Sequence, residues 1–205
     1  MEKPLTDYLN HKVIPDIIRP QVIKALSFFP ELKDEHIIFK FKKSIKKSTM
    51  QAQPALSGLF KKKNNRKYII MISEKFHIEE DTFNIMDVAD NIVVGWLGHE
   101  LGHIMDYRNR SALGMVVFAF RYLFSQKHIT EVERTADTFA VQHGMGDYIL
   151  ETKNFILNHS AISPAYKARI RRLYLSPEEI MEMVNKLKKK KIRKEIDKEV
   201  EKQHY

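Results

Sequence analysis

Residues 96–104 read WLGHELGHI and contain the pattern His-Glu-x-x-His, on which the interpretation of the whole chain depends. In a helix of 3.6 residues per turn, His99 and His103 lie one above the other, so both imidazoles can bind one metal ion. Glu100 projects beside them, where its carboxylate can reach a water molecule on that ion. Zinc lowers the pKa of such a water towards about 7, and a nearby carboxylate can then complete its deprotonation. We therefore predict a zinc site with His99 and His103 as ligands and Glu100 as the catalytic base.

The residues around this pattern favour a packed helix. Three apolar side chains fall roughly opposite the histidines and should face a core: Leu97, Leu101 and Ile104. Three glycines share another face: Gly95, Gly98 and Gly102. Glycine within a helix costs about 1 kcal/mol relative to alanine, so this stripe predicts the close approach of another backbone. A glycine-rich packing helix with incidental histidines is the alternative.

A catalytic zinc site usually has three protein ligands, and the third must come from elsewhere in the chain. The position six residues after His103 is Asn109, so a third histidine is absent there. Glu133 and Asp137 are four residues apart and project from one face of a second helix. We predict Glu133 as the third ligand and Asp137 as the carboxylate that orients a ligand histidine.

Other roles are open to the residues around Glu133. Thr130-x-x-Glu133 also fits a capping box, in which Glu133 only satisfies the start of the helix. Asp137 has no role in that alternative, which favours the ligand interpretation. His128 and Glu131 are further candidate ligands, although nothing in their spacing favours them.

Composition limits the class of protein. The chain has 205 residues, 43% of them hydrophobic, and no cysteine, which excludes disulfides, thiolate zinc sites and cysteine nucleophiles. The first residues, MEKPLTD, show no apolar signal-peptide core, and no apolar run is long enough to span a bilayer. These features predict a cytoplasmic protein.

The formal net charge is +9, and the lysines gather in three clusters. These clusters run from Lys40 to Lys47, from Lys61 to Lys67 and from Lys186 to Lys194. Basic runs can bind nucleic acid or anionic membranes. Aromatic residues do not alternate with these lysines as a base-stacking surface requires, so we do not expect nucleic acid as a partner. Solvated lysine-rich faces are the main expectation, with peripheral contact to an anionic membrane as the alternative.

The remaining segments predict an α+β fold. Residues 1–34 read as short helical pieces interrupted by prolines, and residues 36–42, 49–53 and 67–73 read as strands of a small sheet. Asn64-Asn65 looks like the turn before the last strand. We expect this mixed or antiparallel sheet to pack on a metal-binding helix over residues 82–108, ahead of a helical C-terminal half. Its nearest strand could bind an extended peptide by strand addition.

Residues 112–124, ALGMVVFAFRYLF, form the most hydrophobic stretch of the chain. They are too few to span a bilayer, so we expect a buried helix. A segment that touches a membrane is the alternative, because Arg121 and its basic flanks suit an anionic surface.

The end of the chain predicts helices. Ser163-Pro164 and Ser176-Pro177 both read as helix starts, with serine as the N-cap and proline in the first turn. The last helix becomes almost entirely Lys and Glu and should project into solvent. We predict one domain over residues 1–175 and a charged helix over residues 176–205.

Taken together, the motifs resemble those of the gluzincin metallopeptidases, in which His-Glu-x-x-His lies on one helix and Glu-x-x-x-Asp on the next. Within that group the chain looks most like the catalytic domain of the family of the CaaX prenyl proteases and the heat-shock membrane protease HtpX. Residues 133–141 (ERTADTFAV) resemble that family's Glu-x-x-Ala-Asp-x-Phe/Tyr-Ala run, and residues 163–170 (SPAYKARI) its His-Pro-x-x-x-x-Arg-Ile element. The resemblance covers roughly residues 36–175. It implies a zincin-like fold and zinc-dependent hydrolysis of peptide bonds in a peptide or protein substrate.

The chain departs from this family in two respects. Family members usually carry membrane helices, which this sequence lacks. The family's late histidine, thought to polarise the scissile carbonyl, is Ser163 here. A serine carries no positive charge, so oxyanion stabilisation must come from elsewhere, with Tyr166, Arg169, His143 and His159 as candidates.

Three alternatives to a plain zinc peptidase remain. One is a zinc-binding module without catalytic activity, suggested by Ser163. Another is a regulatory peptidase of the ImmA/IrrE type, which has a similar acidic motif. The third is a peptidase associated with DNA or a membrane, suggested by the lysine clusters.

Overall fold

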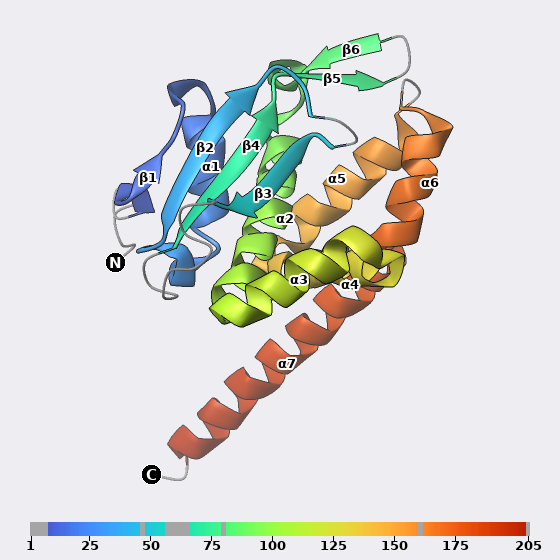
Figure 1. Cartoon of the computed structure of the whole chain (residues 1–205). Coiled ribbons are helices and arrows are strands. Elements are labelled where there is room, and N and C mark those ends of the chain that lie inside the picture. Colours follow the sequence, from blue (N-terminus) through green and yellow to red (C-terminus); the bar gives the residue numbers. More distant parts are fainter. Residues whose placement is uncertain (1–7, 46–47, 56–65, 79–80, 160–161, 204–205) are drawn as a thin grey trace.

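A computed structural model describes residues 8–45, 48–55, 66–78, 81–159 and 162–203. It shows an α+β fold in which a small sheet lies on one side of the molecule and helices fill the other (Figure 1). The strands are β1 Lys12–Val13, β2 His36–Lys42, β3 Met50–Pro54, β4 Lys67–Ser73, β5 Lys75–Ile78 and β6 Asp81–Asn84. The α-helices are α1 Arg19–Leu26, α2 Asp90–Asn109, α3 Ala112–Phe124, α4 Gln126–Ala140, α5 Gly146–Asn158, α6 Pro164–Leu173 and α7 Pro177–Gln203.

The main sheet has the strand order β1-β2-β4-β3 and is mixed. β1, β2 and β4 run parallel, whereas β3 runs antiparallel to β4 at the end of the sheet. Alternating apolar residues form these strands: Ile37 and Phe39 of β2 and Ile70 and Ile72 of β4 are fully buried or nearly so. The predicted strands 36–42 and 67–73 are confirmed, and the strand predicted over 49–53 is present at Met50–Pro54. The inner face of this sheet covers α2.

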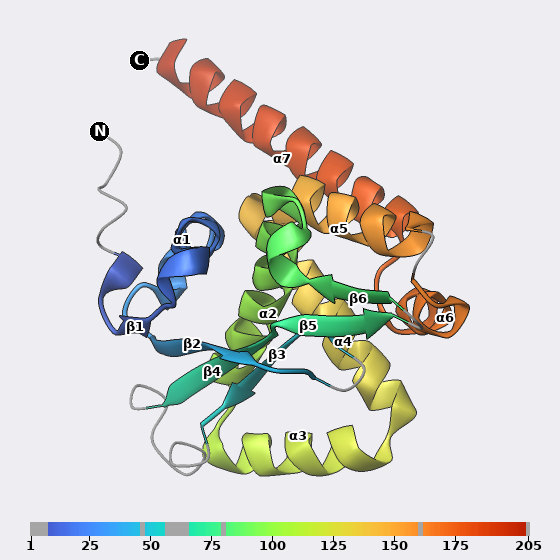
Figure 2. The ribbon, with the colours of Figure 1, turned by 90° about the horizontal axis from the view of Figure 1, so that it is seen from above.

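α2 is the central helix of the fold, with β3 and α1 on one side and α4 and α5 on the other. The view from above shows these layers around it (Figure 2). Leu97, Leu101 and Ile104 have no exposed surface, as the sequence predicts. α2 begins at Asp90 rather than near residue 82, because residues 81–84 pair with β5 as a two-stranded antiparallel sheet.

The glycines of α2 allow two helices to approach it closely. A Cβ placed on Gly95 would lie 2.5 Å from the Tyr148 carbonyl oxygen of α5. A Cβ on Gly102 would lie 2.3 Å from the Ala136 carbonyl oxygen of α4. Both distances are far below van der Waals contact, so the expected close approach of another backbone is confirmed at two positions.

α3 differs from the sequence-based expectation. The helix itself is present over residues 112–124, but only Met115 and Phe118 are buried. Its other large apolar side chains are exposed: Leu113, Val116, Val117, Phe120, Leu123 and Phe124. The prediction of a buried helix is wrong, because no other described element covers the outer side of α3.

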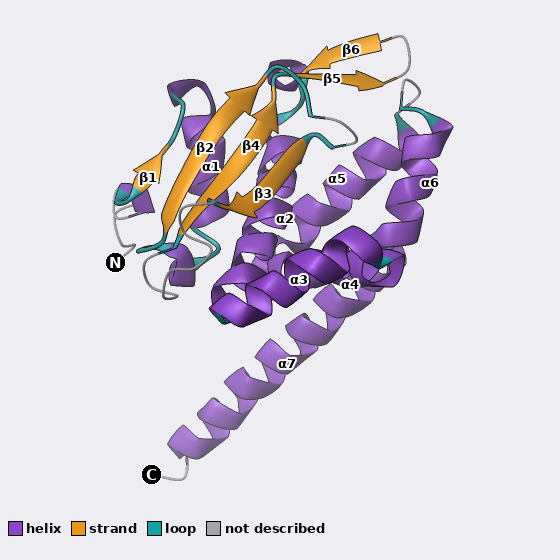
Figure 3. Cartoon of the chain, viewed as in Figure 1, coloured by secondary structure: helices purple, strands orange, loops and turns teal. Residues whose placement is uncertain are grey.

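The C-terminal half is helical, as predicted (Figure 3). Ser163 caps α6 by accepting a hydrogen bond from the Tyr166 N–H, and Pro164 occupies its first turn. α7 packs through Ile180, which is fully buried, and is exposed from Lys188 to Lys202. Among the described residues, no helix is both long and apolar enough to cross a bilayer. The boundary near residue 175 and the cytoplasmic location stay predictions, and the Asn64-Asn65 turn lies outside the described residues.

Candidate metal centre

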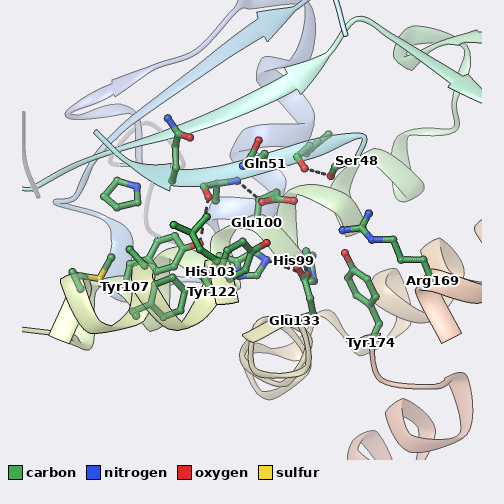
Figure 4. Close-up of a pocket in the computed structure, with 18 residues that line it drawn as sticks. Ser48, Gln51, His99, Glu100, His103, Tyr107, Tyr122, Glu133, Arg169 and Tyr174 are labelled. Atoms are coloured by element: carbon green, nitrogen blue, oxygen red, sulfur yellow. Dashed lines mark hydrogen bonds and ion pairs between the residues drawn. The ribbon is translucent and has the colours of Figure 1, made fainter. Parts of the chain in front are cut away.

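Three potential metal ligands meet between α2 and α4. One ligand atom from each of His99, His103 and Glu133 lies within 4.8 Å of the others, and all three residues are buried. Glu133 Oε2 is 3.1 Å from His99 Nε2 and 3.4 Å from His103 Nε2. Figure 4 shows the three side chains directed at one another below β3. Two imidazoles and a carboxylate in this arrangement form a group that could hold a metal ion.

The packing of α2 on α4 explains why these side chains meet. Ala136 lies against Gly102 with no space for a side chain between the two backbones. Glu133 precedes Ala136 by almost one turn, so the same approach brings its carboxylate to the histidines of α2. The small residues at this crossing therefore set the separation of the proposed ligands.

Asp137 lies behind the group and fixes one of its histidines. Nδ1–H of His99 donates a hydrogen bond of 2.9 Å to Asp137 Oδ1, which leaves Nε2 of His99 facing Glu133. The other oxygen of Asp137 accepts hydrogen bonds from the Leu175 N–H at 3.0 Å and from Lys153 Nζ at 2.9 Å. Asp137 has no exposed surface, so these contacts account for its buried charge.

The carboxylates of Asp137 and Glu133 make the cluster favourable for positive charge. Burial disfavours charged His99, but hydrogen bonds and charges from Asp137 and Glu133 outweigh it and raise its pKa to about 10. Burial would also raise the pKa of Glu133, yet His103 and His99 hold it well below its usual value. The lowered pKa values of Glu133 and Asp137 keep both carboxylates ionised at neutral pH, and His99 is protonated on both nitrogens when no metal is bound. A metal bound here would take the place of the proton on Nε2 of His99.

Glu100 occupies a different environment. Burial raises the pKa of its carboxyl above the usual value, although His103 and His99 oppose that change. Its Oε2 accepts a hydrogen bond of 2.6 Å from the Ala52 N–H of β3. This bond fixes the carboxylate beside the histidines, and the raised pKa makes it a better proton acceptor than an exposed glutamate.

The edge of β3 that faces this site is already engaged. The Ala52 N–H donates to Glu100, and the Ala52 carbonyl accepts from the Tyr107 hydroxyl at 3.4 Å. The Met50 carbonyl accepts a hydrogen bond from Ser48 Oγ. A peptide that added to β3 as a further strand would have to replace these contacts.

A cavity of about 650 Å³ opens in front of the three proposed ligands. One wall is β3 and the opposite wall is α3, whose lining residues are Met115, Phe118, Ala119, Tyr122 and Leu123. Arg169 and Tyr174 also line the cavity, and Figure 4 shows their polar ends close to one another on the side of His99 and Glu133. Burial raises the pKa of Tyr174 well above its usual value, so its hydroxyl is a hydrogen-bond donor at neutral pH.

The competing interpretations of the acidic segment do not fit the structure. α4 begins at Gln126 with Ser125 as its N-cap, so Thr130 lies inside the helix and the capping-box reading is wrong. His128 is buried beside Glu131, with 3.4 Å between Nδ1 and Oε2, and neither belongs to the triad. Among the candidates for carbonyl polarisation, only Arg169 lines the main cavity, and His143 instead contacts the Phe139 carbonyl.

Two residues at the site were missed from the sequence. Lys153 lies between Ile149 and Ile156 on the apolar face of α5, and a lysine at such a position signals a buried ionic partner. Tyr174 follows the end of α6, where no periodic pattern singles out one residue. Its ring lies 5.2 Å from that of His99 and beneath the Lys153 ammonium, 3.9 Å from its centroid.

Comparison with known proteins gives no assignment. No protein-family model matches the chain. No curated protein and no solved structure matches it either. Function must therefore be argued from the site itself.

Proposed function

We propose that this chain is a zinc-dependent peptidase in which His99, His103 and Glu133 bind the metal. The observation that supports this most directly is the meeting of these three buried groups beside Glu100 in an open cavity. Imidazole and carboxylate ligands suit zinc, whereas calcium and magnesium prefer oxygen ligands alone. Three protein ligands leave a fourth position, which is the usual pattern of a catalytic rather than a structural zinc.

Zinc in this position would polarise a substrate carbonyl and lower the pKa of the attacking water. Glu100 takes the proton of that water and passes it to the leaving amine. Its place beside the histidines and its raised pKa support this role. Because the Ala52 N–H holds one carboxylate oxygen, the other is left to exchange the proton.

Tyr174 and Arg169 take over the role that a late histidine would have. Both line the same cavity as the three proposed ligands, so their polar groups could reach the oxygen of a carbonyl bound there. The Tyr174 hydroxyl donates a hydrogen bond, and the Arg169 guanidinium supplies positive charge. Asp137 keeps His99 in the tautomer that presents Nε2, and Lys153 compensates the charge of Asp137.

The test is digestion of a peptide library by the purified chain, followed by mass spectrometry, with and without a zinc chelator. Wild-type protein should cleave, and chelation should abolish cleavage. Glu100→Gln should retain zinc and lose hydrolysis, because it keeps the shape but not the basicity of the side chain. A chain that binds zinc but cleaves nothing would instead be a silent zinc-binding module.

A further inference from the structure

The outer face of α3 is an exposed apolar surface that the proposed activity does not explain. Five of its residues have the spacing i, i+3, i+4, i+7 and i+11, which places them on one stripe: Leu113, Val116, Val117, Phe120 and Phe124. Leu123 lies beside them. Between 49% and 75% of each of these six residues is exposed. Burying so much apolar surface would be strongly favourable, so its exposure points to a partner.

α3 is held so that this stripe faces outward. Its inner side packs through Met115 and Phe118, and the Phe118 ring contacts those of Tyr107 and His128. Figure 2 shows α3 along one edge of the molecule, opposite α7. One side of α3 is therefore anchored in the domain, and the other side is exposed to solvent.

The charges around the stripe indicate what covers it. Arg121 is the one charged residue within α3, and Lys127 follows it at the start of α4, with both side chains exposed. Arg121 lies 4.0 Å from Glu131, but both partners are about half exposed, so solvent screens this long ion pair. α3 contains no carboxylate, and the whole chain carries a net charge of +9. An apolar face with cations at its margin suits an anionic lipid surface.

A protein partner fits this face less well. Protein interfaces carry about one hydrogen bond per 100–200 Å² and a polar rim, whereas Arg121 is the one ionic side chain that α3 offers. A two-fold contact between two copies would bring the Arg121 and Lys127 side chains of both chains together around the same patch, where these like charges repel one another. Lipid acyl chains require no hydrogen bonds, and phosphate headgroups accept from both cations.

We propose that α3 docks the protein on the surface of an anionic lipid bilayer, lying flat with Phe120 and Phe124 inserted among the acyl chains. With 13 residues, the helix can lie in the interface but cannot cross the bilayer. Ala119 and Leu123 are exposed and also line the cavity, so the docked cavity opens beside the membrane. Substrates would then be reached at the bilayer surface.

Flotation of the full chain with vesicles tests this proposal. Wild-type protein should float with vesicles that contain phosphatidylglycerol and much less with phosphatidylcholine alone. Phe120→Ser/Phe124→Ser should lower partitioning at least roughly tenfold, because two buried aromatic side chains are lost. The matched control is Ile192→Ser/Ile196→Ser on α7, where two equally apolar side chains are 56% and 54% exposed. This control should bind as wild type does.

Two further measurements make the result decisive. Tryptophan emission from Phe120→Trp should shift to the blue with anionic vesicles and be quenched by brominated lipid, whereas Ile196→Trp should not respond. Light scattering gives the oligomeric state of wild type and of the α3 double variant. Failure of wild type to float, equal loss in both double variants, or a dimer that the α3 substitutions dissociate would each overturn the proposal. None of these readouts requires metal or hydrolysis, so the proposed peptidase activity stands or falls separately.

Discussion

The crossing of α2 and α4 at Gly102 gives the sharpest test of how the fold builds the candidate metal site. In Gly102→Ala, the new Cβ would lie 2.3 Å from the Ala136 carbonyl oxygen and 2.9 Å from its carbonyl carbon. A relaxed carbon–oxygen contact is about 3.3 Å, so the two backbones must separate by roughly 1 Å. Overpacking of this kind costs about 1–3 kcal/mol, and the better helix propensity of alanine returns about 1 kcal/mol.

This separation also moves Glu133, because it lies on α4 one turn before Ala136. Metal–ligand distances tolerate changes of only about 0.2 Å, so we expect zinc affinity to fall roughly tenfold or more. Gly98→Ala is the matched control, one turn away on the same helix. Its Cβ would meet Met145 Cε and Sδ at 2.5 and 2.6 Å, at the end of a flexible side chain that can turn aside.

Urea denaturation and chelator competition for zinc measure both effects. We expect Gly102→Ala to be less stable than Gly98→Ala and to bind zinc more weakly. If Gly102→Ala kept both the stability and the zinc affinity of Gly98→Ala, the argument that this close approach positions Glu133 would be refuted.

Substitutions at Lys153, Asp137, Tyr174 and Glu179 test the surroundings of the site. Lys153→Met should lower the free energy of unfolding by about 3 kcal/mol, because it leaves the buried charge of Asp137 less compensated. The double variant Lys153→Met/Asp137→Asn should lose less stability than Lys153→Met and Asp137→Asn lose in sum, as measured by urea denaturation midpoints. Tyr174→Phe should retain zinc and KM but lower kcat about 100-fold; unchanged kcat would remove Tyr174 from carbonyl polarisation. Hydrogen bonds from Arg134 and the Ser176 N–H hold the pKa of Glu179 below its usual 4.5, so Glu179 stabilises the fold above that pH and loses this effect as pH falls through its lowered pKa. Glu179→Gln should therefore lower Tm slightly at pH 7, and the difference from wild type should vanish in acid; a constant difference would contradict this.

Sequence patterns identified those parts of the fold that depend on local periodicity. Alternation in residues 36–42 and 67–73 identified two strands, because each has one buried face. The spacing of His99, His103, Glu133 and Asp137 identified the side chains that meet, because spacing within a helix fixes which residues share a face. Which residues of one helix share a face can be read from the sequence in this way, and here the two chemically matched faces meet.

Features that depend on distant packing could not be read in the same way. Composition made residues 112–124 look buried, but burial depends on whether other elements cover a helix, and here one side is left open. Residues 82–84 were included in the predicted metal-binding helix because short strands are recognised mainly by their pairing, which here is with β5. The two-residue strand β1 is too short for any alternation to appear. The contacts of Glu100 and Tyr107 with Ala52 depend on where β3 crosses α2, which sequence periodicity does not specify.

Metal analysis of the purified chain tests the central claim most directly. Elemental analysis of wild type should find one zinc per chain, and Glu100→Gln should retain it. Glu133→Ala should lose most of the zinc while remaining folded by circular dichroism. Wild-type protein that holds no zinc after exposure to the metal, or Glu133→Ala protein that retains a full equivalent, would contradict a site built by His99, His103 and Glu133.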